Sequence, residues 1–216
     1  MSRLARLATV LTLALATTVA CAPSYRIMHR TESTVFPGAV GNADEYDATR
    51  ARWSRSEALG VRGSAEVTMV DPELGADEVA LRTRHDVHDL ARGYDRDLWE
   101  VLYGPRGDRM PFEVRWRFDK LYQPQRITNP KVGWTFTLMD DHGRRWEALD
   151  VGEVEQGSDS DAWTGSFRVW FPIRDVLRGP LFDGRTGTVT LRISGAPGWA
   201  DFVWKFRPSV GADAEN

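Results

Sequence analysis

Apolar and polar residues alternate through much of the chain, and the alternation is clearest over 163–173. The apolar side chains that would share one face of a strand there are Phe167, Val169, Phe171 and Ile173. Arg168 and Trp170 would point to the other face. A period of two is typical of a strand with one face on a core. We therefore predict that 163–173 is a central strand of an antiparallel sandwich.

Other short alternating runs are separated by residues that favour turns. They cover 61–70, 98–103, 111–118, 134–138, 145–151, 188–193 and 202–206. The segment 152–161 is expected to be an acidic loop, and 174–184 a long connection with Pro180 and Gly184. About seven short strands with such spacing predict a mainly β fold, an immunoglobulin-like antiparallel β-sandwich.

One or two accessory helices are predicted before the sandwich strands. The first lies near 44–59, with Trp53 as its anchor on the domain. The second lies near 72–93, where Asp71 is a plausible N-cap and Pro72 occupies the first helical position. Gly75 weakens the first turn of this second helix.

The hairpin residues Leu138, Asp140 and Gly143, followed by Phe167, Val169 and Pro172, give a recognisable order. It resembles the telokin-like immunoglobulin domains of bacterial lipoproteins over about 110–207. The whole chain is also similar to uncharacterised lipoproteins of high-GC proteobacteria. These resemblances imply a sandwich fold and supply no reaction, because the shared residues are turn and packing positions.

The N-terminus has the pattern of an export signal. Arg3 and Arg6 precede an apolar run over 7–19, which is too short to span a bilayer. The segment 17–21, ending in Cys21, resembles a bacterial lipobox. The resemblance implies cleavage before Cys21, a diacylated thiol and an acylated amine. The alternative is an ordinary secretory signal with an incidental cysteine.

We therefore divide the chain into a signal peptide over 1–20, lipidated Cys21 with a flexible tether over 21–43, a helix-decorated sandwich over 44–208 and a polar tail over 209–216. Cys21 is the single cysteine, so no disulfide can form within the chain and an apolar core must stabilise the fold. The formal net charge of −3, with both signs interspersed, argues against a nucleic-acid partner.

Two groups of polar residues are candidates for metal binding. His85, His88 and Asp89 would share a helix face at the spacing of metal ligands. The acidic residues that could gather calcium are Asp150, Glu153, Glu155, Asp159 and Asp161. In both cases a solvated polar surface explains the residues as well. We expect no resident cofactor and no firmly assigned metal.

No catalytic motif stands out along the chain. Ser166 follows a glycine but lies inside a predicted strand, without the pattern of a nucleophile elbow. The tripeptide 106–108, Arg-Gly-Asp, falls where a hairpin must turn, so turn chemistry explains it. A catalytic role is therefore not expected.

Trp170 and Trp199 are the candidate contact residues, with Arg168 beside Trp170. Exposed tryptophans stack on sugars or dock partners. The alternative for Trp170 is that an accessory helix covers it. Trp116, Trp134 and Trp204 lie on predicted core faces.

Together these features predict a lipid-anchored protein of the bacterial cell envelope, at the outer membrane. It would contact the membrane through Cys21 and have a non-catalytic interaction or structural role with an envelope protein partner. One alternative is a polysaccharide- or peptidoglycan-binding module that uses Trp170 and Trp199. Another is a divalent-metal-binding protein that uses His85, His88 and Asp89.

Overall fold

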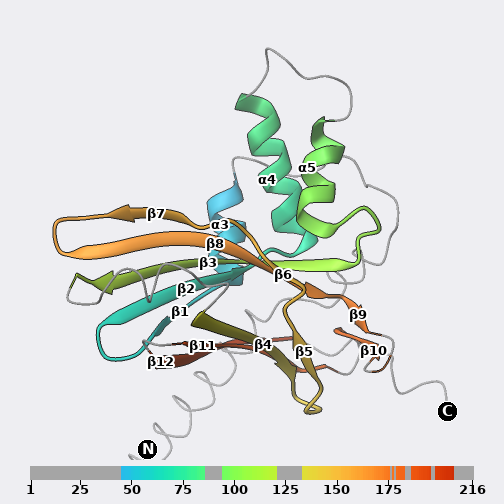
Figure 1. Cartoon of the computed structure of the whole chain (residues 1–216). Coiled ribbons are helices and arrows are strands. Elements are labelled where there is room, and N and C mark those ends of the chain that lie inside the picture. The colour runs from blue at the N-terminus through green and yellow to red at the C-terminus, as the bar shows by residue number, and fades with distance from the viewer. Residues whose placement is uncertain are drawn as a thin grey trace, which may run out of the picture.

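The computed structural model describes residues 45–85, 94–120, 133–175, 177, 179–182, 186–195 and 198–206. Two antiparallel sheets lie face to face, and helices cover the outer face of the larger sheet (Figure 1). The predicted fold class, a mainly β antiparallel sandwich with accessory helices, is confirmed. No helix within the described ranges is long and apolar enough to cross a membrane.

The larger sheet follows the order β1-β2-β3-β8-β6, and β7 also pairs with β8. Its strands are β1 (Ser54–Ala58), β2 (Gly63–Met69), β3 (Arg109–Asp119), β6 (Asp150–Val151), β7 (Glu155–Ser158) and β8 (Ala162–Pro172). The predicted central strand is confirmed as β8, which pairs with all eleven residues of β3 in antiparallel register. The β7–β8 hairpin projects past the end of the sandwich (Figure 1).

The smaller sheet follows the order β12-β11-β4-β5. Its strands are β4 (Trp134–Asp140), β5 (Arg145–Glu147), β11 (Thr188–Gly195) and β12 (Gly198–Lys205). The predicted return strand over 145–151 is divided between the sheets, because β5 pairs with β4 and β6 pairs with β8. Within the connection over 174–184, β9 (Arg174–Asp175) pairs with β10 (Gly179–Pro180).

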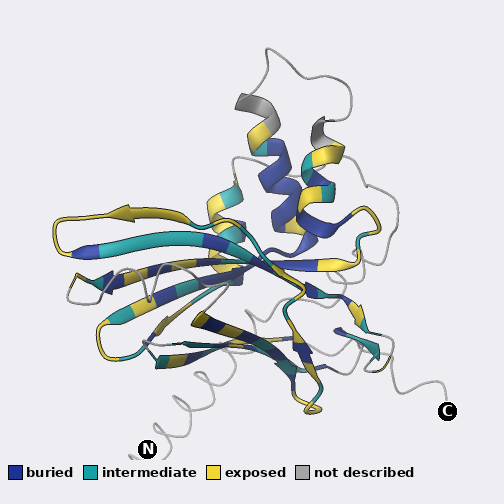
Figure 2. Cartoon of the chain, viewed as in Figure 1, coloured by how far each residue is buried: buried dark blue, intermediate teal, exposed yellow. Residues whose placement is uncertain are grey.

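Buried residues lie along the strands of both sheets (Figure 2), and aromatic side chains from the two sheets pack together in one core. Phe112 of β3 packs edge-on against Trp204 of β12, with ring centroids 5.5 Å apart. Phe167 of β8 meets Phe136 of β4 at 5.6 Å and Trp134 at 6.0 Å. Such pairs add specific attraction to the burial of large apolar surfaces, which is the main stabilising term for a chain without disulfides.

Within the described residues, three helices precede or interrupt the strands: α3 (Tyr46–Trp53), α4 (Pro72–His85) and α5 (Tyr94–Tyr103). The prediction for 44–59 is wrong beyond Trp53, because 54–58 pairs with β2 as an edge strand. The prediction of a strand over 98–103 is also wrong. Trp99, Leu102 and Tyr103 form the buried stripe of α5, a helical spacing that two-residue alternation cannot produce. For the second predicted helix, 86–93 lies outside the described residues.

The start of α4 is fixed by the buried carboxylate of Asp71. Its Oδ1 accepts a hydrogen bond from the Leu74 backbone N–H at 3.0 Å, so the predicted N-cap is confirmed. Tyr103 of α5 donates its hydroxyl to the Asp71 carbonyl at 2.7 Å. A Cβ at Gly75 would lie 1.9 Å from that hydroxyl, so the glycine that weakens the helix is what lets the two helices meet here.

Burial raises the pKa of Asp71 to about 7, although the Leu74 N–H bond acts in the opposite direction. Its Oδ2 is buried without a hydrogen-bond partner. The folded state therefore binds a proton more tightly than the unfolded chain, whose pKa is near 3.8. The stabilising contribution of protonated Asp71 is complete below about pH 4 and is lost as the pH rises through about 7.

We expect Asp71→Asn to become more stable relative to the wild type as the pH rises from 4 to 8. Asparagine caps a helix as well as aspartate and does not titrate. Urea unfolding at several pH values should show the difference in unfolding free energy growing by on the order of 4 kcal/mol between pH 4 and pH 8. Parallel pH profiles for the two proteins would contradict this role of Asp71.

Candidate functional site

The outer face of the larger sheet is polar where α3 and α4 cover it. One cross-strand row is Thr68, Glu113 and Arg168, from β2, β3 and β8. Thr68 is fully buried, and the side chains of Glu113 and Arg168 are only 14% and 19% exposed. A helix layer normally buries apolar residues on a sheet, so a charged layer here needs its own explanation.

Glu78 of α4 lies at the centre of these charges. Its Oε1 accepts a hydrogen bond from Arg168 at 2.5 Å and forms a salt bridge with Arg82 at 2.7 Å. The Glu78 side chain is 6% exposed. Burial alone would lower the pKa of Arg168, but Glu78 and then Glu113 outweigh burial and raise it. Arg168 therefore stays charged while being largely removed from water.

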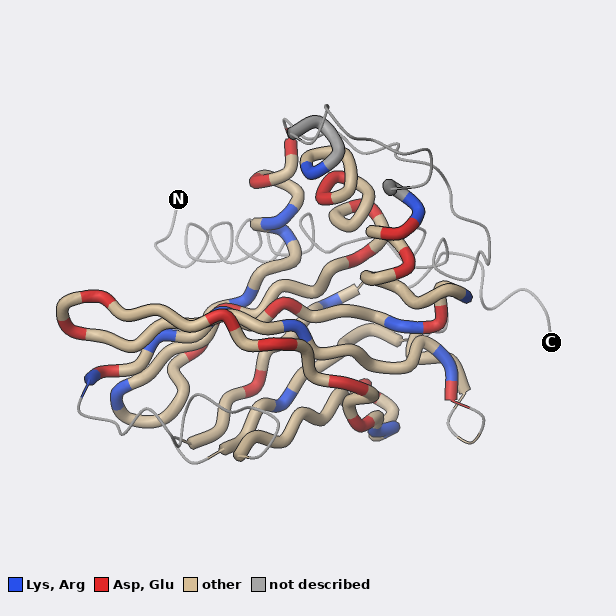
Figure 3. Tube along the Cα trace, turned by 45° about the horizontal axis from the view of Figure 1, so that its top comes forward, with Lys and Arg blue, Asp and Glu red and all other residues tan. Residues whose placement is uncertain are grey.

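A second set of contacts joins α3 to the same face. Arg50 forms a salt bridge with Glu66 at 3.0 Å and lies 3.9 Å from Glu113. Glu113 also accepts a hydrogen bond from Arg115 at 2.8 Å. Basic and acidic residues occur together in the helices and in the strands beneath them (Figure 3). Several surface elements are thus held together by charge pairs on this face.

A β-bulge shapes the edge of the sheet next to these charges. Asp150 and Val151 pair with Trp170 and Val169, whereas Glu155 pairs with Ser166. The three residues 152–154 therefore lie opposite only two residues of β8, 167–168, so the edge segment carries one extra residue. In an unbroken register Glu155 would pair with Gly165, which lies on the face of Trp116 and the core. The extra residue turns Glu155 outward beside Ser166, a use typical of bulges near binding sites.

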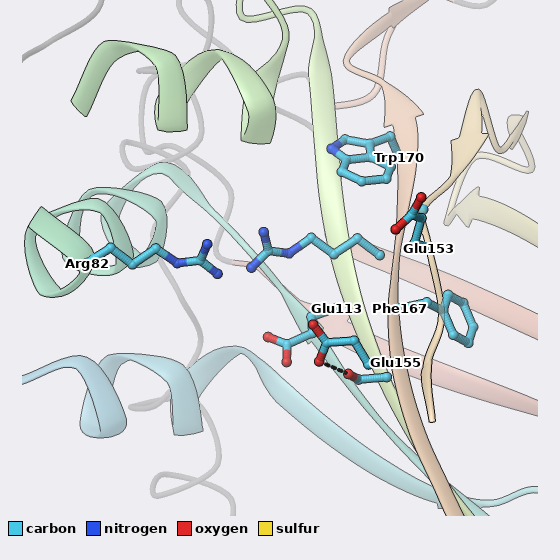
Figure 4. A pocket seen from close by; sticks show the side chains of 9 residues that line it. Arg82, Glu113, Glu153, Glu155, Phe167 and Trp170 are labelled. Carbon is cyan, nitrogen blue, oxygen red and sulfur yellow. Dashed lines mark hydrogen bonds between the residues drawn. The ribbon is translucent and has the colours of Figure 1, made fainter. Parts of the chain in front are cut away.

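Between α4, β3 and this bulge lies a pocket of about 290 Å³. It is lined by Arg82, Glu113, Gly152, Glu153, Glu155, Ser166, Phe167, Arg168 and Trp170. Arg82 reaches in from α4, while Glu153 and Glu155 come from the opposite side (Figure 4). Ser166 Oγ lies 3.4 Å from Glu155 Oε2. The volume is near the lower limit for small-molecule sites.

The two ends of the pocket differ in charge. Arg82 and Arg168 share one carboxylate, that of Glu78, and Glu113 is a further acidic neighbour of Arg168. Glu113 is paired with Arg115. Glu153 and Glu155 are exposed, and neither forms a salt bridge with a basic residue in the part of the chain described above. The pocket can therefore bind an anionic and a cationic group at the same time.

Trp170 forms one wall of the pocket and is half-buried. Its Nε1 donates a hydrogen bond to the Leu102 carbonyl of α5 at 2.8 Å. A Cβ at Gly152 would lie 3.2 Å from its six-membered ring, so the bulge packs against it. This agrees with the alternative in which an accessory helix covers Trp170. The helical pair covers it, although α5 supplies the contact rather than the expected helix over 72–93.

Trp199 lies far from this pocket in the fold. It is 63% exposed on the outer face of the smaller sheet, and the Arg192 guanidinium lies 5.1 Å from its ring centroid. Trp170 is on the outer face of the other sheet. The structure therefore brings Arg168 and Trp170 into one site and does not bring Trp199 there.

Most of the other candidate residues cannot be placed. Cys21, His29, His88 and Asp89 lie outside the described residues, and His85 is described only as the last residue of α4. Among the described residues no group of three or more His, Cys, Asp or Glu side chains could hold a metal ion.

The predicted acidic loop over 152–161 contains the strand β7, so the loop assignment is wrong for 155–158. Two of its carboxylates are held by an arginine rather than by one another. Arg117 of β3 contacts Asp159 and donates to Asp161 at 3.0 Å. Arg106-Gly107-Asp108 forms the turn after α5, where Gly107 has a φ of +62°, as turn chemistry predicts.

Reasoning from the sequence missed most of the pocket residues. The alternation of β3 puts Glu113 on the outer face, but spacing along the chain does not predict which residues form salt bridges with it. Glu78 and Arg82 lie four residues apart in a predicted helix, a separation that predicts a salt bridge but not a pocket. The one-residue bulge that turns Glu155 outward leaves no signal in the local pattern.

No protein-family model and no curated protein matches this chain. The chain is similar to a crystal structure of a protein of unknown function from Burkholderia pseudomallei. The sequence identity is 13%, and the match covers 88% of this chain and 92% of that chain. The TM-score is 0.39, which is a weak structural similarity. The resemblance to telokin-like lipoprotein domains stays a prediction.

Proposed function

We propose that this protein is a lipid-anchored component of the bacterial cell envelope with a non-catalytic binding role. The lipid would be attached at Cys21, and the sandwich would present the pocket at Arg168 and Trp170 to an envelope partner. The anchor rests on the lipobox-like segment 17–21. The binding role rests on one structural observation, a polar pocket with charges of both signs under the helix layer.

Two features of the pocket support binding over a purely structural role. Glu78 is almost fully buried, and holding a buried carboxylate between two guanidiniums is no more stabilising than apolar packing of the same volume. The β-bulge turns two further carboxylates toward the same cavity. Glu78 does not line the pocket itself, but it holds Arg82 and Arg168, which do, and charges held at such a cost beside a pocket are typical of ligand sites.

The glycan alternative is favoured by Trp199, whose indole is largely exposed on the opposite sheet. One position near this ring is already taken by Arg192, which also forms a two-point salt bridge with Asp201 at 2.7 Å for each contact. The Trp170 indole has less free surface for a sugar, because α5 and Gly152 pack against it. We therefore place glycan binding second.

The anchor is tested by Cys21→Ser. We expect the wild-type protein to incorporate labelled fatty acid and to sediment with membranes, and the Cys21→Ser protein to lose both properties. Fractionation with metabolic acyl labelling measures this. Membrane association of Cys21→Ser, together with an unlabelled wild type, would contradict the anchor. The substitution removes only the thiol that would carry the lipid, so we expect the fold to be unaffected.

A further inference from the structure

We propose that the pocket at Arg168 and Trp170 binds a small zwitterion, an amino acid or short peptide with a free ammonium and a free carboxylate. This inference rests on the proposed binding role of that pocket and names its ligand class. It follows from which charges in the pocket are compensated and which are not.

The carboxylate would bind at the end of the pocket that Arg82 and Arg168 line. Both guanidiniums contact one oxygen of Glu78, at 2.7 Å and 2.5 Å, so two positive charges share a single carboxylate as their salt-bridge partner. A guanidinium has five N–H donors, and a single shared carboxylate oxygen leaves donors free for a ligand. Arginine is also the side chain best suited to bind a carboxylate through two parallel hydrogen bonds.

The ammonium would bind on the opposite side, at Glu153 and Glu155. The bulge places both carboxylates on the pocket, and no basic residue of the described chain forms a salt bridge with either. An ammonium offers three donors, and the Ser166 hydroxyl beside Glu155 provides a further acceptor.

The size of the pocket limits the ligand to a few residues. About 290 Å³ is at the lower end of the range for small-molecule sites. The Trp170 indole and the backbone of the bulge give an apolar wall between the charged ends. A compact molecule with opposite charges at its two ends and a small apolar body matches this division. A neutral sugar would leave the charges unpaired in a partly dry site.

Isothermal titration of the full-length protein in detergent micelles tests the inference. The probe is the dipeptide L-alanyl-L-alanine, compared with its N-acetyl derivative, which lacks the ammonium, and its C-terminal amide, which lacks the carboxylate. We expect the free dipeptide to bind and each blocked form to bind at least about tenfold more weakly, because each loses a charge-assisted contact. N-acetylglucosamine serves as the neutral-sugar probe and should not bind.

Variants locate the site. Glu153→Gln and Arg82→Gln should each weaken dipeptide binding by about tenfold. Both residues are exposed or half-exposed, and Glu78 keeps Arg168 as a partner, so both variants should fold. The matched control is Glu147→Gln, an exposed glutamate on β5 in the other sheet, which should bind like the wild type. Thermal unfolding of each variant verifies that it is folded.

The outcomes separate this inference from the proposed function. No binding of the dipeptide by the folded wild type, or equal binding of a blocked form, overturns the zwitterion. Equal loss in Glu147→Gln overturns the assignment of the ligand to this pocket. Neither result affects the lipid anchor or the contact of this face with a partner, which fatty-acid labelling and crosslinking measure independently.

Discussion

Replacing Glu78 with alanine should lower the free energy of unfolding by about 3–5 kcal/mol, the usual effect of breaking one partner of a buried ion pair. The Arg168 side chain is 19% exposed and would lose its closest carboxylate, at 2.5 Å. Its remaining acidic neighbour, Glu113, already pairs with Arg115. An unpaired guanidinium would then remain under the helix layer. Urea unfolding should show a lower midpoint with an unchanged m-value.

Glu100→Ala is the matched control for Glu78→Ala. Glu100 also forms a salt bridge with an arginine four residues away on a helix, at 2.9 Å, but its side chain is 35% exposed and that of the arginine 67%. Its loss should cost less than about 1 kcal/mol. The double variant Glu78→Met with Arg168→Met should recover much of the lost stability, because neither charge is left alone. Equal losses for the two alanine variants would show that the charged layer is solvated.

Trp204→Ala should destabilise the protein by about 3–5 kcal/mol, the range for truncating a large aromatic residue in a core. Trp204 is fully buried, its ring packs against Phe112 of the facing sheet, and its Nε1 donates to the Trp53 carbonyl at 2.7 Å. The substitution leaves a cavity between the sheets and an unpaired carbonyl at the end of α3. Equilibrium unfolding measures the loss.

Trp199→Ala is the control for that prediction, since it removes the same side chain from the same strand. Trp199 is 63% exposed and points away from the core, with Arg192 as its neighbour. Its replacement should change the unfolding free energy by less than about 1 kcal/mol. If Trp199→Ala were as destabilising as Trp204→Ala, the assignment of the two faces of β12 would be wrong.

The pattern of the sequence was sufficient for the parts of the fold that follow local rules. Period-two alternation identified β8 and the face of Phe167 and Val169, because side chains of a strand must alternate between core and solvent. The start of α4 was readable from Asp71 and Pro72, whose capping and dihedral preferences act within one turn.

The errors fall where distant contacts override local preference. Residues 54–58 form an edge strand because β2 offers unpaired backbone groups, a partner that local helix propensity ignores. Residues 98–103 form a helix because their apolar stripe packs on α4. The sequence pointed to Arg168 and Trp170 in the pocket but not to Arg82 and Glu155, which come from other elements and meet them only through tertiary packing and a bulge.

In-cell photocrosslinking is the most direct test of the claim that the face at Arg168 and Trp170 contacts an envelope partner. A photoreactive residue would replace Glu153 in the pocket or Glu147 on the other sheet, followed by detergent extraction and mass spectrometry of the captured species. We predict a discrete adduct from position 153 and none from position 147. Capture from position 147 with none from position 153 would contradict this account.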